Sequence, residues 1–243
     1  MPETHPPRQS MNFLRLGFAL LLWPGLVATL LFFGKLFRNI TQTPGFPWAG
    51  VMVFAGGFIL ACVAFFALPR PRGIYVLGHE LTHALAVWMS GGKVHSLQAS
   101  SKGGKVLSDR VSPWISLAPY IFPFYPMIAG ILWLAGTRIW PELQQFPLPV
   151  LGLWGAIWGY HYAFTFDLFP TRQPDFLIYG RFFSLTLIIL GNAFLIGGLL
   201  WSTFRPSPLG DTLLHLGSDW AWTYTSIAHW ITGLLLHYLP HSA

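Results

Sequence analysis

Long apolar runs, separated by short polar or Pro/Gly-rich stretches, recur along the whole chain. About 20 apolar residues in a row are enough for a helix to cross the hydrocarbon core of a bilayer. The pattern therefore predicts an all-α integral membrane protein with about six transmembrane helices. The expected spans cover approximately residues 11–33, 48–68, 73–90, 113–136, 148–166 and 182–201.

The two ends of the chain differ from this pattern. Residues 1–10 are polar and proline-rich, and we expect them to be disordered. The apolar run that follows is too long for a signal peptide and shows no small-x-small cleavage site, so a retained first span is favoured. The membrane-embedded domain is expected at 11–205. The C-terminal segment, 206–243, mixes Asp219 and three histidines with many Trp, Tyr and Leu residues between Asp211 and Leu239, a composition that favours an interfacial amphipathic helix over a seventh span.

One polar segment, residues 93–110, follows the third run. Polar and apolar residues alternate from Lys93 to Gln98, and the Gly103-Gly104 pair marks a turn. This combination predicts a short β-hairpin.

The composition supports a membrane protein and argues against several other kinds of function. Hydrophobic residues make up 53% of the chain and charged residues only 9%, against roughly 25% charged in soluble domains. The net charge of +6 comes from basic residues in short loops, which fits anchoring to the lipid bilayer rather than nucleic-acid binding. A multi-pass protein of a bacterial cell membrane is expected. Cys62, the single cysteine, excludes an intrachain disulfide and a cysteine metal cluster.

The third run contains His79-Glu80-Leu81-Thr82-His83. Histidines four residues apart lie on one face of a helix, where both imidazoles reach one metal ion. Glu80 lies beside that position and is placed to take a proton from metal-bound water. It is also the only glutamate in any predicted span, and ionisable groups at membrane depth usually serve function. The alternatives are a hydrogen-bonded cluster without metal and a zinc site without catalysis.

The helix that continues as Ala84-Leu85-Ala86, followed by Gly91-Gly92-Lys93-Val94, resembles the site-2 protease family of intramembrane zinc proteases. Members carry HExxH, an alanine-rich helix, a glycine-containing break and a hairpin that dips toward the active site. The resemblance covers about residues 73–195. It implies peptide-bond hydrolysis of a membrane protein substrate with a transmembrane segment.

Zinc needs a third protein ligand, and the candidates are Asp175, Asp167 and His161. The family's second motif, Asn-x-x-Pro-x-x-x-Leu-Asp-Gly, aligns its proline with Pro170 and its zinc ligand with Asp175. Asp167 replaces its asparagine, and the leucine and glycine are also replaced, by Pro174 and Phe176. The register implies that Asp175 is the ligand, with Asp167 and His161 as alternatives. Asp175 could instead pair with a nearby arginine, Arg172 or Arg181.

The loss of the motif's asparagine affects catalysis as well, because an ionised Asp167 cannot donate a hydrogen bond to an oxyanion. His161 is an alternative oxyanion stabiliser, or a hydrogen-bonded core histidine.

The resulting prediction is a zinc metalloprotease in which His79, His83 and Asp175 hold Zn²⁺ and Glu80 activates the zinc-bound water. One alternative is a non-proteolytic pseudoprotease that binds transmembrane segments; the retention of Glu80 argues against it. The other is a transporter with a buried metal or proton site. The lack of carboxylates in the first, second and fourth spans argues against ion transport.

Overall fold

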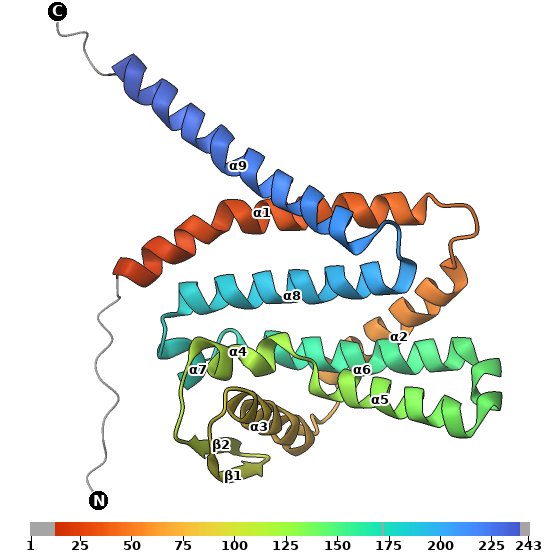
Figure 1. Cartoon of the computed structure of the whole chain (residues 1–243). Coiled ribbons are helices and arrows are strands. Elements are labelled where there is room, and N and C mark those ends of the chain that lie inside the picture. Colours follow the sequence, from red (N-terminus) through yellow and green to blue (C-terminus); the bar gives the residue numbers. More distant parts are fainter. Residues whose placement is uncertain (1–12, 172, 239–243) are drawn as a thin grey trace, which may run out of the picture. The chain divides into compact units, whose positions relative to one another are not determined.

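The computed structural model describes residues 13–171 and 173–238 as helices, connecting loops and one small sheet (Figure 1). The chain divides into two compact units. A terminal unit comprises Met1–Phe46 and Gly180–Ala243, and a central unit comprises Pro47–Tyr179. The expectation of disorder at residues 1–10 concerns positions outside the described residues.

The terminal unit consists of three helices, α1 (Phe13–Thr41), α8 (Arg181–Phe204) and α9 (Leu209–Tyr238). Helix α1 packs against both others. Its contact with α9 is close, because the indole of Trp220 lies over Gly25 and donates a hydrogen bond of 2.9 Å to Thr29 Oγ1. The expected C-terminal helix is therefore present as α9, and a partly buried hydrogen bond joins it to α1.

In the central unit, α2 (Trp48–Ala67) and α6 (Pro147–Leu168) pack closely along their length. Glycines allow this approach. A Cβ at Gly155 would overlap the backbone carbonyl of Phe54, and one at Gly159 would overlap that of Phe58. Small residues at helix contacts are typical of membrane proteins, where the backbones approach closely to gain van der Waals packing.

Helix α3 (Arg72–Met89) carries the HELTH sequence and joins α6 through aromatic packing. The rings of Tyr75 and Phe164 stack with centroids 3.5 Å apart. The C-cap of the helix is Ser90, and the next residue, Gly91, has φ +69°. The N–H groups of Gly91 and Gly92 donate to the carbonyls of Trp88 and Val87, respectively, at 2.9 Å. Glycine adopts this left-handed conformation without the strain that a Cβ brings.

The predicted hairpin is confirmed. Strands β1 (Val94–Ser100) and β2 (Gly103–Ser108) pair antiparallel, with Ser100 opposite Gly103 across the turn. Both strands contact α3. The hairpin therefore lies beside the helix that carries the candidate site.

The fourth predicted span is two helices, α4 (Pro113–Ile121) and α5 (Phe124–Ile139), bent by 65°. Pro123 disfavours helical geometry at the residue before it, and Phe122 has φ −93° and ψ 113°. The pattern of apolar residues continues across this break, which explains why one span was expected. A short 3₁₀ helix, η1 (Pro141–Gln145), connects α5 to α6, and a single turn, α7 (Pro174–Leu177), follows α6.

The described residues form an all-α membrane protein with one small sheet, as predicted. Three helices are long and apolar enough to span a bilayer, namely α1, α2 and α8, and the bent pair α4–α5 counts as a fourth. This is fewer than the six expected spans. Helix α3 has a polar face with two histidines and a glutamate, and α6 is rich in aromatic residues and glycine. Both helices are therefore less hydrophobic than their small number of charged residues suggests.

Candidate metal centre

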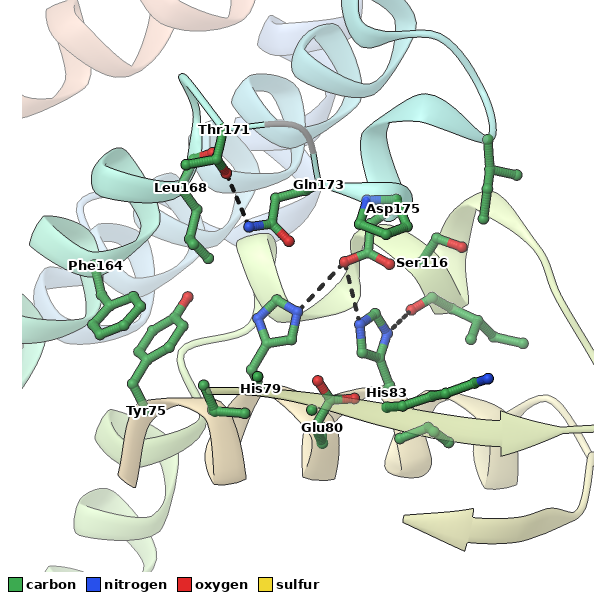
Figure 2. A pocket seen from close by; sticks show the side chains of 18 of the residues that line it. Tyr75, His79, Glu80, His83, Ser116, Phe164, Leu168, Thr171, Gln173 and Asp175 are labelled. Carbon is green, nitrogen blue, oxygen red and sulfur yellow. Dashed lines mark hydrogen bonds and ion pairs between the residues drawn. The ribbon is translucent and has the colours of Figure 1, made fainter. Parts of the chain in front are cut away.

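The two histidines of α3 lie one helical turn apart and point in the same direction (Figure 2). The centroids of the His79 and His83 rings are 4.9 Å apart. Both side chains are largely buried, with exposed fractions of 9% and 10%. The i, i+4 spacing of the motif therefore produces the expected pair of imidazoles.

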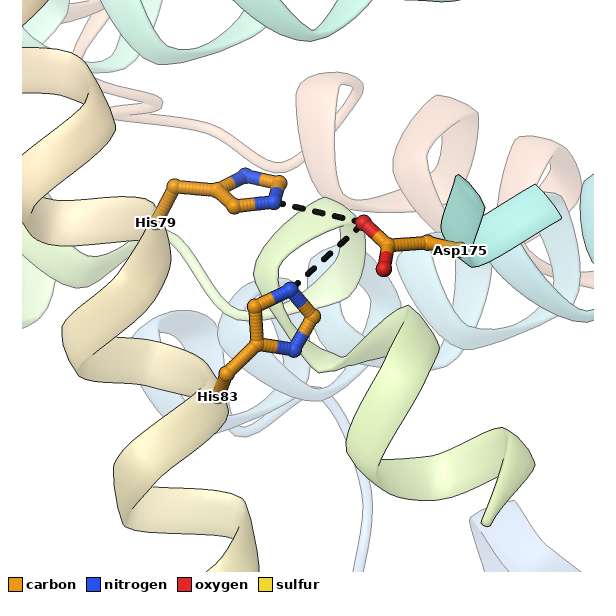
Figure 3. Close-up of side chains that lie close together, drawn as sticks. All are labelled: His79, His83 and Asp175. Carbon is orange, nitrogen blue, oxygen red and sulfur yellow. Dashed lines mark ion pairs between the residues drawn. The ribbon is translucent and has the colours of Figure 1, made fainter. Parts of the chain in front are cut away.

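Asp175 completes the cluster from α7, as Figure 3 shows. Its Oδ2 lies 3.4 Å from Nε2 of His79 and 3.5 Å from Nε2 of His83. The three candidate ligand atoms lie within 4.8 Å of one another. Tyr120 of α4 donates a hydrogen bond of 2.9 Å to the same carboxylate. Side chains of α3 and α4 thus contact Asp175 of α7.

The hydrogen-bond partners of His83 and Asp175 indicate which of their atoms carry protons. The Ile115 carbonyl lies 2.8 Å from Nδ1 of His83. A carbonyl only accepts, so Nδ1 carries a proton and Nε2 faces Asp175. Burial raises the pKa of the Asp175 carboxyl, but hydrogen bonds from His79 and His83 outweigh it, and the pKa lies well below its ordinary value. A lone pair on Nε2 would repel this carboxylate unless a cation, either a metal ion or a proton, lies between them.

The donor set fits zinc. Two imidazoles and one carboxylate are a ligand set that catalytic zinc sites use, with a further position left for water or substrate. The backbone acceptor at Nδ1 of His83 is also the kind of outer partner that orients metal-binding histidines.

Glu80 lies beside the cluster without being part of it. Its side chain is buried, and strand β2 passes over it at Gly104. A cavity of about 680 Å³ opens here, and its lining includes Glu80, His79, His83 and Asp175. The carboxylate of Glu80 and the candidate ligands therefore face the same space.

Basic side chains also line this cavity: Arg72, Lys102, Lys105 and Arg110. All four are exposed. Arg110 donates to the Ser90 carbonyl at 2.6 Å, and among the described residues no carboxylate forms an ion pair with any of the four. The sequence predicted these residues only as headgroup anchors, because it does not show that hairpin and helix bring them to one cavity.

The alternative ligands lie elsewhere. Asp167 accepts two hydrogen bonds from Arg70, at 2.8 and 2.9 Å, and is outside the cluster although it lines the large cavity. His161 is outside the cluster and, together with His79, lines a separate small cavity. The register of the second motif thus selected the aspartate that the fold places beside the two histidines. The role of that aspartate as a zinc ligand stays a prediction.

Two contributors were not expected from the sequence. Tyr120 lies in a proline-rich apolar run where nothing marks it as polar in function. Gly104 was interpreted only as part of a turn. Its second role, leaving room for the side chain of Glu80, depends on a contact between residues far apart in the chain.

Comparison with known proteins shows similarity to one kind of curated protein. The chain is 26% identical over 181 residues to phosphatidylglycerol–prolipoprotein diacylglyceryl transferases of Francisella tularensis subsp. holarctica, among them those of strains OSU18 and LVS. The alignment covers 66% of this chain, and the chain spans 64% of the length of these relatives. No protein-family model and no solved structure matches.

This similarity corrects the functional prediction. The relatives are transferases, so the assignments to the site-2 protease family and to a zinc metallopeptidase are wrong, and so is the prediction of peptide-bond hydrolysis. The pseudoprotease and transporter alternatives do not match either. The physical reason is that HExxH spacing places two imidazoles and a carboxylate in space but does not determine which bond reacts. The predicted multi-pass membrane location is confirmed.

Proposed function

We propose that this chain is a metal-dependent membrane transferase that moves a lipid-derived group from an anionic phospholipid to an acceptor. One observation carries the proposal: the candidate ligands His79, His83 and Asp175, and the carboxylate of Glu80, face a cavity whose rim is basic. The similarity to transferases named for phosphatidylglycerol and prolipoprotein supports the same substrate class.

The ligand residues His79, His83 and Asp175 would hold Zn²⁺. Bound zinc supplies a positive charge that polarises a substrate oxygen without a proton transfer. Tyr120 holds the Asp175 carboxylate in place through its hydroxyl, and Ile115 does the same for the His83 ring. These contacts keep the ligands in one arrangement in the absence of substrate.

Glu80 is the proposed general base. In transfer of a diacylglyceryl group, the bond between its glycerol carbon and the phosphate oxygen breaks. A nucleophilic atom of the acceptor bonds to that carbon and gives up its proton to Glu80. The headgroup leaves as glycerol phosphate, which keeps the electron pair of the broken bond. Proton transfer to a positioned carboxylate contributes about 10²–10⁴-fold in such reactions.

The basic rim is suited to the phosphate of the donor. Hydrogen bonds between lysine or arginine and phosphate are charge-assisted and therefore stronger than neutral ones. Basic residues close to a membrane surface also attract anionic lipids, by about 1 kcal/mol each. Arg72, Lys102, Lys105 and Arg110 would raise the local concentration of the donor beside Glu80.

The test uses the purified full-length protein in vesicles of phosphatidylglycerol with a prolipoprotein peptide. Mass spectrometry of the peptide measures the added diacylglyceryl group, and an enzymatic assay measures the released glycerol phosphate. Glu80→Gln should retain zinc and lose transfer by about a hundredfold or more, because the amide does not accept the proton. Glu142→Gln changes an exposed glutamate of η1 in the same way and should leave transfer unchanged.

Two results would overturn the proposal. One is full transfer activity after zinc has been removed and shown to be absent. The other is a peptide that gains no lipid, whether it stays intact or is cleaved.

A further inference from the structure

The Nδ1 atoms of His79 and His83 have different surroundings. Nδ1 of His83 has the Ile115 carbonyl as acceptor. Nδ1 of His79 is buried and has no hydrogen-bond partner among the described residues, and the same holds for Nε2 of His161 on α6. A buried polar atom without a partner costs about 1–3 kcal/mol, so such atoms usually have an unseen partner.

Both residues line one small cavity, and Asp175 is not part of its lining. It has a volume of about 10 Å³. That is close to the space that a single water molecule needs. The lining also includes the apolar residues Pro119, Phe122 and Phe124. The hydroxyls of Thr82 and Tyr125 already donate to backbone carbonyls, which leaves the two ring nitrogens and the Tyr75 hydroxyl as the groups available to a water there.

The required hydrogen-bond directions are complementary. If Nε2 of His79 presents a lone pair toward Asp175 and a metal ion, Nδ1 carries the proton and must donate. Histidines that bind metals almost always donate their second N–H to a carboxylate, carbonyl or water. His161 can keep its own proton on Nδ1 and accept at Nε2.

We propose that one buried water links His79 to His161, accepting from Nδ1–H of His79 and donating to Nε2 of His161. His161 is then a positioning residue: it holds the His79 ring in the orientation and tautomer that metal binding needs. The inference rests on the proposed zinc site and assigns to His161 a role other than ligand or oxyanion donor.

Zinc affinity, measured by chelator competition on the full-length protein, tests this inference. His161→Phe removes the acceptor and should weaken zinc binding by about 10–100-fold, as loss of an outer partner of a ligand does. His161→Gln retains an acceptor and should recover most of that loss. Thr165→Val provides the matched control. Thr165 is a buried residue one turn further along α6, outside the small cavity, and its substitution should leave zinc affinity unchanged.

Equal affinity in the parent and His161→Phe proteins, or an equal loss in Thr165→Val, would refute the link. A high-resolution structure of the zinc-bound parent gives a second readout that needs no variant. Density for one water between the two rings is expected, and a direct contact or an empty cavity would refute the link. If the parent binds no zinc at all, the metal centre itself fails. If zinc binds but the variants behave alike, only the role of His161 fails.

Discussion

Gly104 of β2 lies directly against the side chain of Glu80 on α3. A Cβ at residue 104 would come within 2.5 Å of Oε1 and 2.7 Å of Cδ of that glutamate. The Glu80 carboxylate can occupy its present position under the hairpin only because residue 104 has no side chain. The contact sets the position of the carboxylate between the helix and the cavity.

We expect Gly104→Ala to reduce transfer activity by about a hundredfold, because the added methyl group displaces the Glu80 carboxylate, and a shift of about 1 Å at a reacting group can cost that much. Zinc content and thermal stability should change little, since a flexible side chain can move aside. Gln98→Ala, at an exposed position of β1, is the control. Wild-type activity in the Gly104→Ala protein would show that this contact does not position a base.

The two aspartates after α6 should respond differently to loss of charge. Asp175→Asn should weaken zinc binding by about a hundredfold or more, because it removes the carboxylate from the ligand set. Asp167→Asn should leave zinc in place, since Asp167 pairs with Arg70 at 2.8 Å outside the cluster. Metal analysis after dialysis measures both. Zinc lost from the Asp167 variant and kept in the Asp175 variant would contradict the geometry.

The basic rim should affect donor binding. Lys105→Glu is expected to raise the KM for phosphatidylglycerol by about tenfold, because each basic residue near an anionic surface contributes about 1 kcal/mol and the substitution reverses its charge. Lys93→Glu makes the same change in net charge on the same hairpin, but Lys93 does not line the cavity. Kinetics at several salt concentrations compare the two. An equal effect in both variants would mean that only general attraction to the bilayer is involved.

The contact between α2 and α6 should be intolerant of a methyl group. Gly155→Ala would place a carbon against the Phe54 carbonyl, and backbone cannot move aside as a side chain does. We expect a loss of about 1–3 kcal/mol in the free energy of unfolding, the usual cost of overpacking. Gly130→Ala in α5 is the control, because its nearest neighbour would lie 3.7 Å away. Thermal unfolding in detergent measures both, and equal midpoints would refute close packing at Gly155.

The sequence by itself determined the features that depend on local pattern. Long apolar runs set the all-α membrane class, because a bilayer requires every backbone polar group to be satisfied within the helix. The four-residue spacing of His79 and His83 placed both rings on one face of α3. Alternation and paired glycines indicated the hairpin. Each of these is a property of neighbouring residues.

Only the tertiary structure decided the features that depend on residues distant in sequence. Pro123 breaks the helix expected in the fourth apolar run, because its ring disfavours helical geometry at the residue before it. The pattern of hydrophobic residues does not reveal this steric effect. Packing gave the two aspartates different partners. It placed Asp175 beside the two histidines and Asp167 beside Arg70. Packing also brought Gly104 onto Glu80 and four basic side chains around one cavity. These contacts, rather than the motif, define the environment in which the cluster would react.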